Sequence, residues 1–279
     1  MLIERKKIEL SKIQEKMIIS GWGHAAFDET IVEEVVYLSD GLKVKGYIAY
    51  PVNKYNIPCI VWCRGGIGNS GAIDEFNARG MFGKIASKGY AVFAPQYRGN
   101  LGGEGYDEFG GKDLNDIFNM TELADEIPAA NKNVWGIEGW SRGGLMTYLA
   151  LTKSDKFKAA VISGGISNVR NAVNTPLLFN RIKEISVSNL GLEDFNQIVE
   201  NRSVINFVEK ISDRTPLLII HGTNDERVLA KDPIELSLKL LELKRDFRLV
   251  MLENGDHFLK KHRTEVDRLR FEWFKTYLK

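Results

Sequence analysis

A serine lies between two glycines at residues 139–143, where the sequence reads Gly-Trp-Ser-Arg-Gly. The strand-like run NVWGIEGW leads into it, and the helix-like run GLMTYLALTK follows. On such a sharp strand-to-helix turn a serine hydroxyl is exposed and can act as a nucleophile. Side chains at 139 and 143 would collide with the neighbouring strand and helix, so glycine is needed there. The motif predicts Ser141 as a nucleophile.

A serine hydroxyl requires a general base, and three histidines follow it in the chain. His257 lies in MLENGDHFLKK, just beyond the last apolar run and before the final helix, which is where the base belongs. His221 ends the strand-like run TPLLIIH, so we expect a structural role for it. His262 lies in a basic helical segment and is expected to be solvated. The pattern favours His257 as the base.

The base needs an acid that orients it, and the acid should stand between the serine and the histidine in the chain. Asp225 lies in HGTNDERV, on the loop after the penultimate strand-like run. Asp256 is the alternative, but a side chain adjacent in sequence to the histidine rarely pairs with it in the required geometry. We therefore expect Asp225 to be the acid.

Four segments taken together resemble the catalytic domain of the prolyl oligopeptidase family of serine peptidases. They are GWSRGG, HGTNDERV, GDHF and APQYRGNLGGEGYDEFGGKDLND, and the resemblance covers roughly residues 40–279. The serine motif alone would indicate only the α/β-hydrolase superfamily. The resemblance implies that Ser141 is the nucleophile, Asp225 the acid and His257 the base.

The resemblance also implies substrate-binding and oxyanion-binding groups. Arg227 stands where the family's arginine holds a substrate carbonyl, although a salt bridge with Glu226 or Asp225 is an equal alternative. The oxyanion hole should use the backbone N–H of Arg142 and a second donor from the loop after IVWC. The tyrosine that often precedes the Gly-Gly pair in the family is replaced here by Arg64.

Without that tyrosine, the side chain of Arg64 or a glycine N–H, with Gly65 the candidate, must supply the second donor. Trp140 is a candidate for the substrate-binding pocket. The side chains of Arg142, Arg64 and Arg227 are expected to surround the serine, which would favour carbonyl-rich or anionic substrates.

Many family members carry an N-terminal β-propeller that restricts access to small peptides, and we expect none here because only about 40 residues precede the core. Size selection would then come from a polar, helical insertion at about residues 164–213, from oligomerisation, or not at all. We expect a helical arm over residues 1–30, with a helix at 4–18, and a catalytic domain over 31–279.

The elements that must position these groups follow an α/β pattern. Two strand-like runs flank Asp40-Gly41, a strong hairpin signal. Nearly continuous apolar runs then alternate with helical stretches, which predicts a mostly parallel eight-stranded sheet of the α/β-hydrolase type, with antiparallel first strands and helices on both faces. The runs are IPCIVWC, GYAVFAP, NVWGIEGW, FKAAVISG, TPLLIIHG and DFRLVMLE. Helices are expected at 76–88, 112–127, 142–153, 232–245 and 259–278.

Composition bounds the partners. The 279 residues carry 38 basic and 37 acidic side chains, a net charge of +1, which argues against nucleic acid as a partner. No apolar run suits a membrane span or a signal peptide. Cys59 and Cys63 would lie about 13 Å apart on one strand, too far for a disulfide, and free thiols suit the cytoplasm. No metal or organic cofactor is expected, and a homo-oligomer is possible.

The function expected from the sequence is hydrolysis of peptide bonds in short peptides through an acyl-enzyme. A carboxylesterase acting on small acyl esters is the alternative, because the same machinery cleaves esters. A non-catalytic binding protein on a hydrolase fold is the least favoured alternative, since serine, aspartate and histidine all stand at the expected places.

Overall fold

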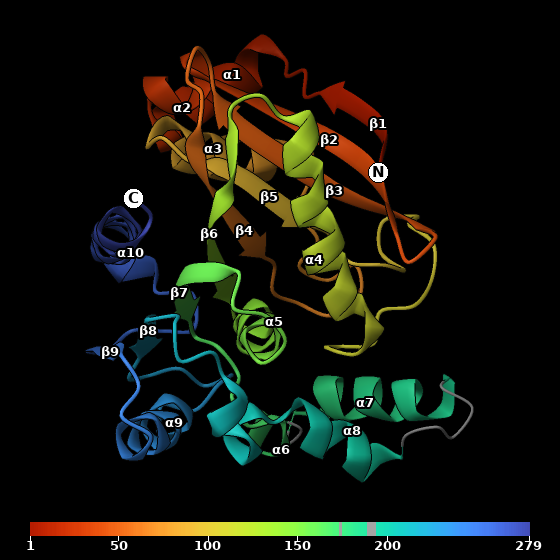
Figure 1. Cartoon of the computed structure of the whole chain (residues 1–279), viewed down its shortest axis with the longest axis vertical. Helices are drawn as coiled ribbons and strands as arrows, with labels where there is room; N and C mark the ends of the chain where they lie inside the picture. Colours follow the sequence, from red (N-terminus) through yellow and green to blue (C-terminus); the bar gives the residue numbers. More distant parts are fainter. Residues whose placement is uncertain (173–174, 189–193) are drawn as a thin grey trace.

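The fold is built on one sheet of nine strands, seen in a computed structural model that describes residues 1–172, 175–188 and 194–279 (Figure 1). The strand order is β1-β2-β3-β5-β4-β6-β7-β8-β9. The strands are β1 (Leu2–Lys7), β2 (Thr30–Ser39), β3 (Leu42–Pro51), β4 (Ile57–Cys63), β5 (Ala91–Pro95), β6 (Ala130–Trp140), β7 (Phe157–Ser163), β8 (Leu217–Gly222) and β9 (Phe247–Leu252).

The sheet confirms the predicted α/β-hydrolase architecture. β2 and β3 form the expected hairpin, in which Asp40 and Gly41 turn with positive φ angles of 50° and 82°. β3 pairs antiparallel with β5, and every pairing from β5 through β4, β6, β7 and β8 to β9 is parallel. The carboxyl ends of these parallel strands share one edge, so loops that follow them can gather at one site.

The amino-terminal arm differs from the prediction, because a ninth strand precedes the eight expected. Residues 2–7 form β1, which pairs antiparallel with β2, where a helix over 4–18 was expected. Helix α1 (Lys12–Trp22) begins only after Ser11, whose side chain accepts the N–H of Gln14 while the Gln14 side chain accepts the N–H of Ser11. Helix α2 (His24–Asp28) completes the arm.

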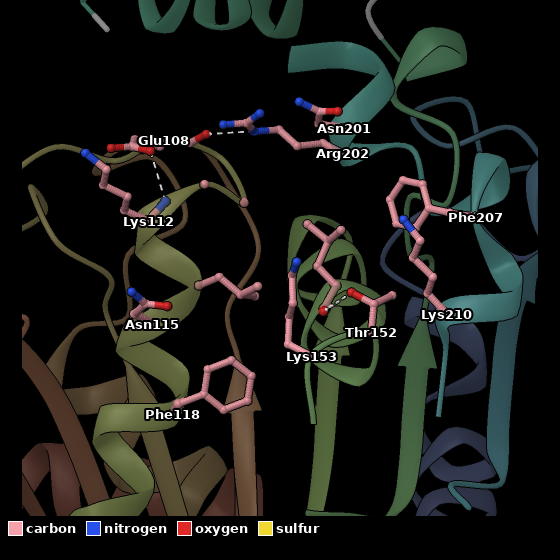
Figure 2. A pocket seen from close by; sticks show the side chains of 14 residues that line it. Glu108, Lys112, Asn115, Phe118, Thr152, Lys153, Asn201, Arg202, Phe207 and Lys210 are labelled. Atoms are coloured by element: carbon pink, nitrogen blue, oxygen red, sulfur yellow. Dashed lines mark hydrogen bonds between the residues drawn. The ribbon is translucent and has the colours of Figure 1, made fainter. Parts of the chain in front are cut away.

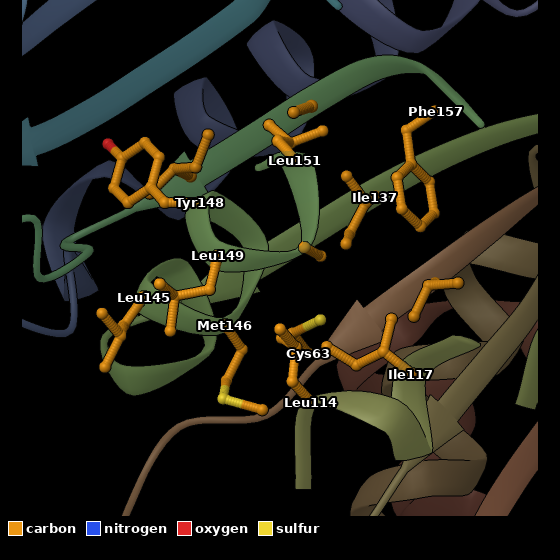
Figure 3. Close-up of a cluster of buried hydrophobic side chains, with 14 of the residues drawn as sticks. Cys63, Leu114, Ile117, Ile137, Leu145, Met146, Tyr148, Leu149, Leu151 and Phe157 are labelled. Atoms are coloured by element: carbon orange, nitrogen blue, oxygen red, sulfur yellow. The ribbon is translucent and has the colours of Figure 1, made fainter. Parts of the chain in front are cut away.

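Helices cover both faces of the sheet and bury two apolar cores. α3 (Glu75–Ser87) and α10 (Arg263–Tyr277) cover one face, with Phe82 and Phe274 in its core. α4 (Asn115–Thr121), α5 (Arg142–Leu151) and α9 (Lys231–Glu242) cover the other. Figure 3 shows part of this second core, where Cys63 lies close to side chains from α4 and α5. Both cysteines are free and buried, as predicted.

The segment over 164–213 contains helices, as predicted. They are α6 (Val169–Ala172), α7 (Pro176–Ser188) and α8 (Phe195–Arg202), which lie together below the sheet in Figure 1. α7 buries Leu178, Ile182 and Ile185, spaced as one helical face, in the core shared with α5. That this segment covers the substrate site stays a prediction, as do the proposed domain boundaries. No helix among the described residues has the length and apolar content of a bilayer span.

Candidate active site

Ser141 occupies a strained turn between β6 and α5. Its φ and ψ angles are 58° and −121°, a combination that side-chain-bearing residues rarely adopt. A Cβ atom on Gly139 would lie 2.0 Å from the carbonyl oxygen of Gly143, and one on Gly143 would lie 1.9 Å from that of Cys63. Both glycines are therefore sterically required, for the reason that the sequence predicts.

Asp225 follows β8 and His257 follows β9, and their side chains meet in a buried hydrogen bond. His257 Nδ1 lies 2.7 Å from Asp225 Oδ2. The N–H groups of Arg227 and Val228 donate to the other carboxylate oxygen, each at 2.9 Å. Burial alone would raise the pKa of Asp225, but the hydrogen bonds from His257 and the two N–H groups hold it below its usual value. The carboxylate is thus fixed in its charged form.

The serine turn and the histidine–aspartate pair meet beside the end of β7. Ser141 donates its N–H to the carbonyl oxygen of Ser163 at 2.9 Å. A Cβ on the next residue, Gly164, would lie 3.5 Å from both Asp225 Oδ2 and His257 Nδ1. Trp140 Nε1 donates to the carbonyl oxygen of His257 at 3.2 Å. The three residues predicted from their motifs therefore lie at the carboxyl ends of β6, β8 and β9, around the end of β7.

The alternatives that the sequence left for base and acid take other roles. His221 is fully buried, with Nε2 2.8 Å from the carbonyl oxygen of Val228, and burial lowers its pKa. His262 is less solvated than expected, because its Nε2 lies 3.0 Å from a backbone carbonyl oxygen and its side chain is 16% exposed. Asp256 accepts the N–H of Lys260 instead of pairing with His257.

The loop after β4 brings Gly65 against the serine, and the Arg64 side chain binds the backbone of this loop. A Cβ on Gly65 would lie 3.4 Å from Ser141 Cβ. The Arg64 guanidinium is fully buried and donates to the carbonyl oxygens of Gln96, Gly65 and Gly68 at 2.9, 3.0 and 2.9 Å. Its N–H groups are engaged within the protein, so the idea that the Arg64 side chain supplies the second oxyanion donor is wrong.

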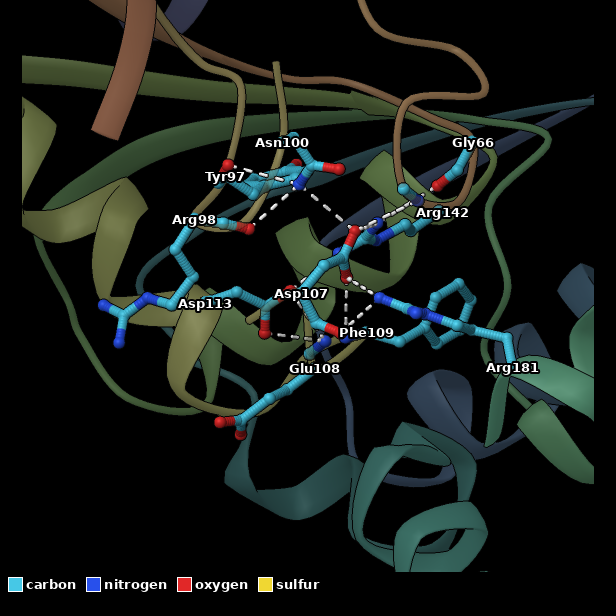
Figure 4. Close-up of polar contacts among 12 residues, drawn as sticks. Gly66, Tyr97, Arg98, Asn100, Asp107, Glu108, Phe109, Asp113, Arg142 and Arg181 are labelled. Carbon is cyan, nitrogen blue, oxygen red and sulfur yellow. Dashed lines mark hydrogen bonds and ion pairs between the residues drawn. The ribbon is translucent and has the colours of Figure 1, made fainter. Parts of the chain in front are cut away.

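Arg142 also points away from the serine, into a buried ionic cluster (Figure 4). Its guanidinium pairs with both oxygens of Asp107, at 2.7 and 2.6 Å, and with Asp113 Oδ2 at 2.6 Å. Asp113 lies in a short 3₁₀ helix over 112–114, and the rings of Tyr97 and Phe109 flank the guanidinium. The expectation that Arg142 and Arg64 form an anion-selective pocket is therefore wrong, because both side chains are buried and bind groups inside the protein.

Charge within this cluster is distributed unevenly. Burial would raise the pKa of Asp107, but the charge of Arg142 and its hydrogen bonds hold it well below its usual value. Asp113 also contacts Arg142, yet burial dominates and raises its pKa. The two carboxylates in turn raise the pKa of Arg142, against the effect of burial. One guanidinium thus pairs with two carboxyl groups, and the negative charge is more stable on Asp107 than on Asp113.

The two predicted substrate-binding residues lie beside His257. Trp140 packs its partly buried ring against the core and supports the histidine backbone through its indole N–H. Arg227 is exposed, and its guanidinium lies 4.8 Å from the ring centre of Phe258, the residue after the histidine. Within the described ranges, neither Glu226 nor Asp225 forms the alternative ion pair with the Arg227 side chain. Contact of either residue with substrate stays a prediction.

A pocket of 870 Å³ opens elsewhere, between α4, the end of α5 and α8 (Figure 2). Lys112, Phe118, Lys153 and Arg202 are among its lining residues, whereas Ser141 is not. In the described part of the chain, no group of three His, Cys, Asp or Glu side chains is arranged as metal ligands.

Sequence reasoning missed the cluster around Asp107. The acidic segment YDEFGGKD resembles part of a family loop in sequence, and it also supplies both carboxylates that bind Arg142. Arg181 of α7 joins the same cluster (Figure 4). The arginine directly after the serine would have pointed to a buried acid only if its burial had been known, because a buried guanidinium requires a partner. The sequence could not tell which of 37 acidic residues it would be.

Known proteins resemble this chain over most of its length. Residues 78–279 match the model of the prolyl oligopeptidase family. A Bacillus subtilis protein named uncharacterized peptidase YtmA is 30% identical over 243 residues, which cover 86% of this chain and 92% of that protein. The uncharacterized peptidase YuxL of the same species is 28% identical, over 89% of this chain and 39% of its own length.

Solved structures of peptidases share this fold. The acylaminoacyl peptidase of Pyrococcus horikoshii superposes with a TM-score of 0.73 at 26% identity, covering 90% of this chain and 42% of that one. The chain thus spans less than half of YuxL and of the archaeal enzyme, and most of YtmA. The family-model match over residues 78–279 includes the serine turn and the loops that carry Asp225 and His257. This chain belongs to the prolyl oligopeptidase family of serine peptidases.

Proposed function

We propose that the protein hydrolyses peptide bonds of short peptides through an acyl-enzyme on Ser141, with His257 as general base and Asp225 as its orienting acid. The observation that carries the proposal is the buried 2.7 Å hydrogen bond between His257 and Asp225. It joins the two loops that stand beside the strained serine. An aspartate that accepts from Nδ1 leaves Nε2 of a neutral imidazole free to accept the serine proton.

The reaction follows from these roles in two stages. Ser141 Oγ attacks the peptide carbonyl carbon while its proton passes to His257 Nε2, and Asp225 stabilises the imidazolium that forms. The backbone N–H groups of Arg142 and Gly65 stabilise the negative oxygen. Collapse of this intermediate sends the proton from His257 to the leaving amine and leaves an ester on Ser141. In the second stage, water attacks the ester carbonyl while His257 accepts its proton, and the carboxylic acid product and free Ser141 are released.

Two observations favour peptides over esters as substrates: an exposed arginine beside His257, and the names of the proteins similar to this chain. Arg227 stands exposed next to His257 and can donate to a backbone carbonyl of the substrate. Proteins similar to this chain include dipeptidyl-peptidase 5 of Porphyromonas gingivalis and the acylaminoacyl peptidase of P. horikoshii. Their names indicate peptide substrates, and we extend that class to this chain.

The test compares aminoacyl and dipeptidyl anilides with acyl esters of matched size, on wild-type protein and on Ser141→Ala. The proposal predicts turnover of anilides by the wild type and none by the variant. Ester turnover without any anilide cleavage would show a carboxylesterase instead. Arg227→Ala should raise KM for dipeptidyl anilides several-fold and leave KM for simple esters unchanged.

A further inference from the structure

Asp107 connects the serine turn to the loop that carries the proposed oxyanion donor. Its side chain pairs with both terminal nitrogens of Arg142, the residue after the serine. The same carboxylate accepts the N–H of Gly68 at 3.2 Å, and Arg142 donates to the carbonyl oxygen of Gly66 at 3.2 Å. The Gly65–Gly68 loop is therefore held at two points by one buried ion pair. Any shift of Asp107 would move this loop relative to Ser141.

Arg181 of α7 reaches Asp107 from outside the catalytic strands and joins the same polar cluster as Arg142 (Figure 4). Its Nη2 donates to the Asp107 carbonyl oxygen at 2.6 Å and lies 3.9 Å from Asp107 Oδ1. The side chain is 19% exposed, and its buried Nε lacks a hydrogen-bond partner among the described residues. A guanidinium buried with one nitrogen unsatisfied carries a cost in stability. The other terminal nitrogen, Nη1, donates to Glu184 Oε2 at 3.3 Å, so Asp107 is the partner through which this guanidinium reaches the serine turn.

We propose that Arg181 is a positioning residue for the oxyanion hole: by fixing Asp107, it keeps Arg142 and the Gly65–Gly68 loop in the geometry that stabilises the tetrahedral intermediate. The inference rests on the proposed function and extends it to α7, a helix otherwise distant from the chemistry. Loss of the Arg181 donor frees the Asp107 backbone and leaves its carboxylate with a single cationic partner. Because an oxyanion donor must be placed closely, a small displacement weakens the transition state more than it weakens substrate binding.

The experiment replaces the guanidinium and keeps the apolar stem. Arg181→Met is compared with Lys183→Met, which removes an exposed cation from the same helix. Arg181→Met should lower kcat about tenfold on anilides and esters alike while KM stays within twofold, since the lost interaction acts in the transition state. The inhibition constant of a peptide boronic acid, whose tetrahedral adduct fills the oxyanion hole, should rise by the same factor. Lys183→Met should match the wild type.

Two further measurements separate this role from a purely structural one. Arg181→Lys restores a donor and a charge, so it should recover part of the lost kcat. Thermal unfolding of each variant reports stability independently of the kinetic split. Wild-type kcat and wild-type boronate inhibition in folded Arg181→Met would overturn the inference while leaving the proposed function intact. Absence of hydrolysis by the wild-type protein would instead overturn the proposed function, and the inference with it.

Discussion

At the scale of single residues, Arg142 shows how one position can carry two tasks. Its backbone N–H is expected to face the reaction, a task that any residue could perform, while its side chain turns inward. The partners of that side chain, Asp107 and Asp113, stand 35 and 29 residues earlier in the chain. Arg142 is only 1% exposed, and its guanidinium is shared between the two carboxyl groups. Removing it would leave both carboxyl groups buried without this cation.

Arg142→Met should therefore destabilise the protein by about 3–5 kcal/mol, the typical cost of breaking a buried ion pair from one side. The free energy of unfolding in urea at neutral pH measures this. Arg227→Met, at an exposed arginine, serves as the control and should cost under about 1 kcal/mol. If Arg142→Met lowered the free energy of unfolding no more than the control does, the stabilising role of the buried Arg142 ion pairs would be contradicted.

At the scale of elements, the serine turn depends on close approach between β4, β6 and α5. Gly143→Ala should lower the free energy of unfolding by about 2 kcal/mol or more, because its Cβ would overlap the Cys63 carbonyl. Gly21→Ala, in α1 where a new Cβ meets nothing within 4 Å, should instead raise it by about 0.5–1 kcal/mol. Denaturant unfolding of both variants checks the opposite signs, and equal effects would contradict the packing argument.

Most elements could be predicted because local signals agreed with the fold. The parallel strands are continuous apolar runs, and Asp40-Gly41 marks the hairpin by its turn chemistry alone. β1 could not be predicted in this way: LIERKK is mostly exposed, and it is a strand only because the edge of β2 offers hydrogen-bond partners. The start of α1, by contrast, was readable from the capping pair Ser11 and Gln14.

The same distinction applies to the site. Ser141, Asp225 and His257 each stand in a short motif at the end of a strand, so the sequence could nominate them, and Asp225 and His257 form a hydrogen bond. The directions of the Arg64 and Arg142 side chains depend on contacts with segments distant in sequence, and no local pattern encodes them. The sequence therefore predicted the proposed catalytic residues but not the buried arginine contacts that hold the surrounding loops in place.

At the scale of the whole molecule, folding buries a carboxyl group beneath the serine turn. Glu138 in β6 is 4% exposed and lies 2.9 Å from Arg270 of α10. Burial raises the pKa of Glu138 to about 7, against the opposing charge of Arg270. Between about pH 4.5 and 7 the folded state keeps a proton that the unfolded state has released. This group therefore lowers the stability of the fold as pH rises through that window.

Glu138→Gln should remove this dependence. Relative to wild type, the variant should gain about 2 kcal/mol in free energy of unfolding between pH 5 and pH 8, whatever its offset at pH 5. Denaturant unfolding of the variant and of the wild type at a series of pH values measures the difference. A constant difference across the series would contradict the raised pKa.

The central claim is that peptide hydrolysis proceeds through an ester on Ser141, with His257 as the base. The most direct measurement is rapid acid quench of the protein during turnover of an aminoacyl or dipeptidyl substrate, followed by mass spectrometry of its fragments. We expect one acyl group on the fragment that contains Ser141, none in Ser141→Ala, and acylation slowed by at least about a thousandfold in His257→Ala. Hydrolysis that persists in Ser141→Ala, or an acyl group on another residue, would contradict it.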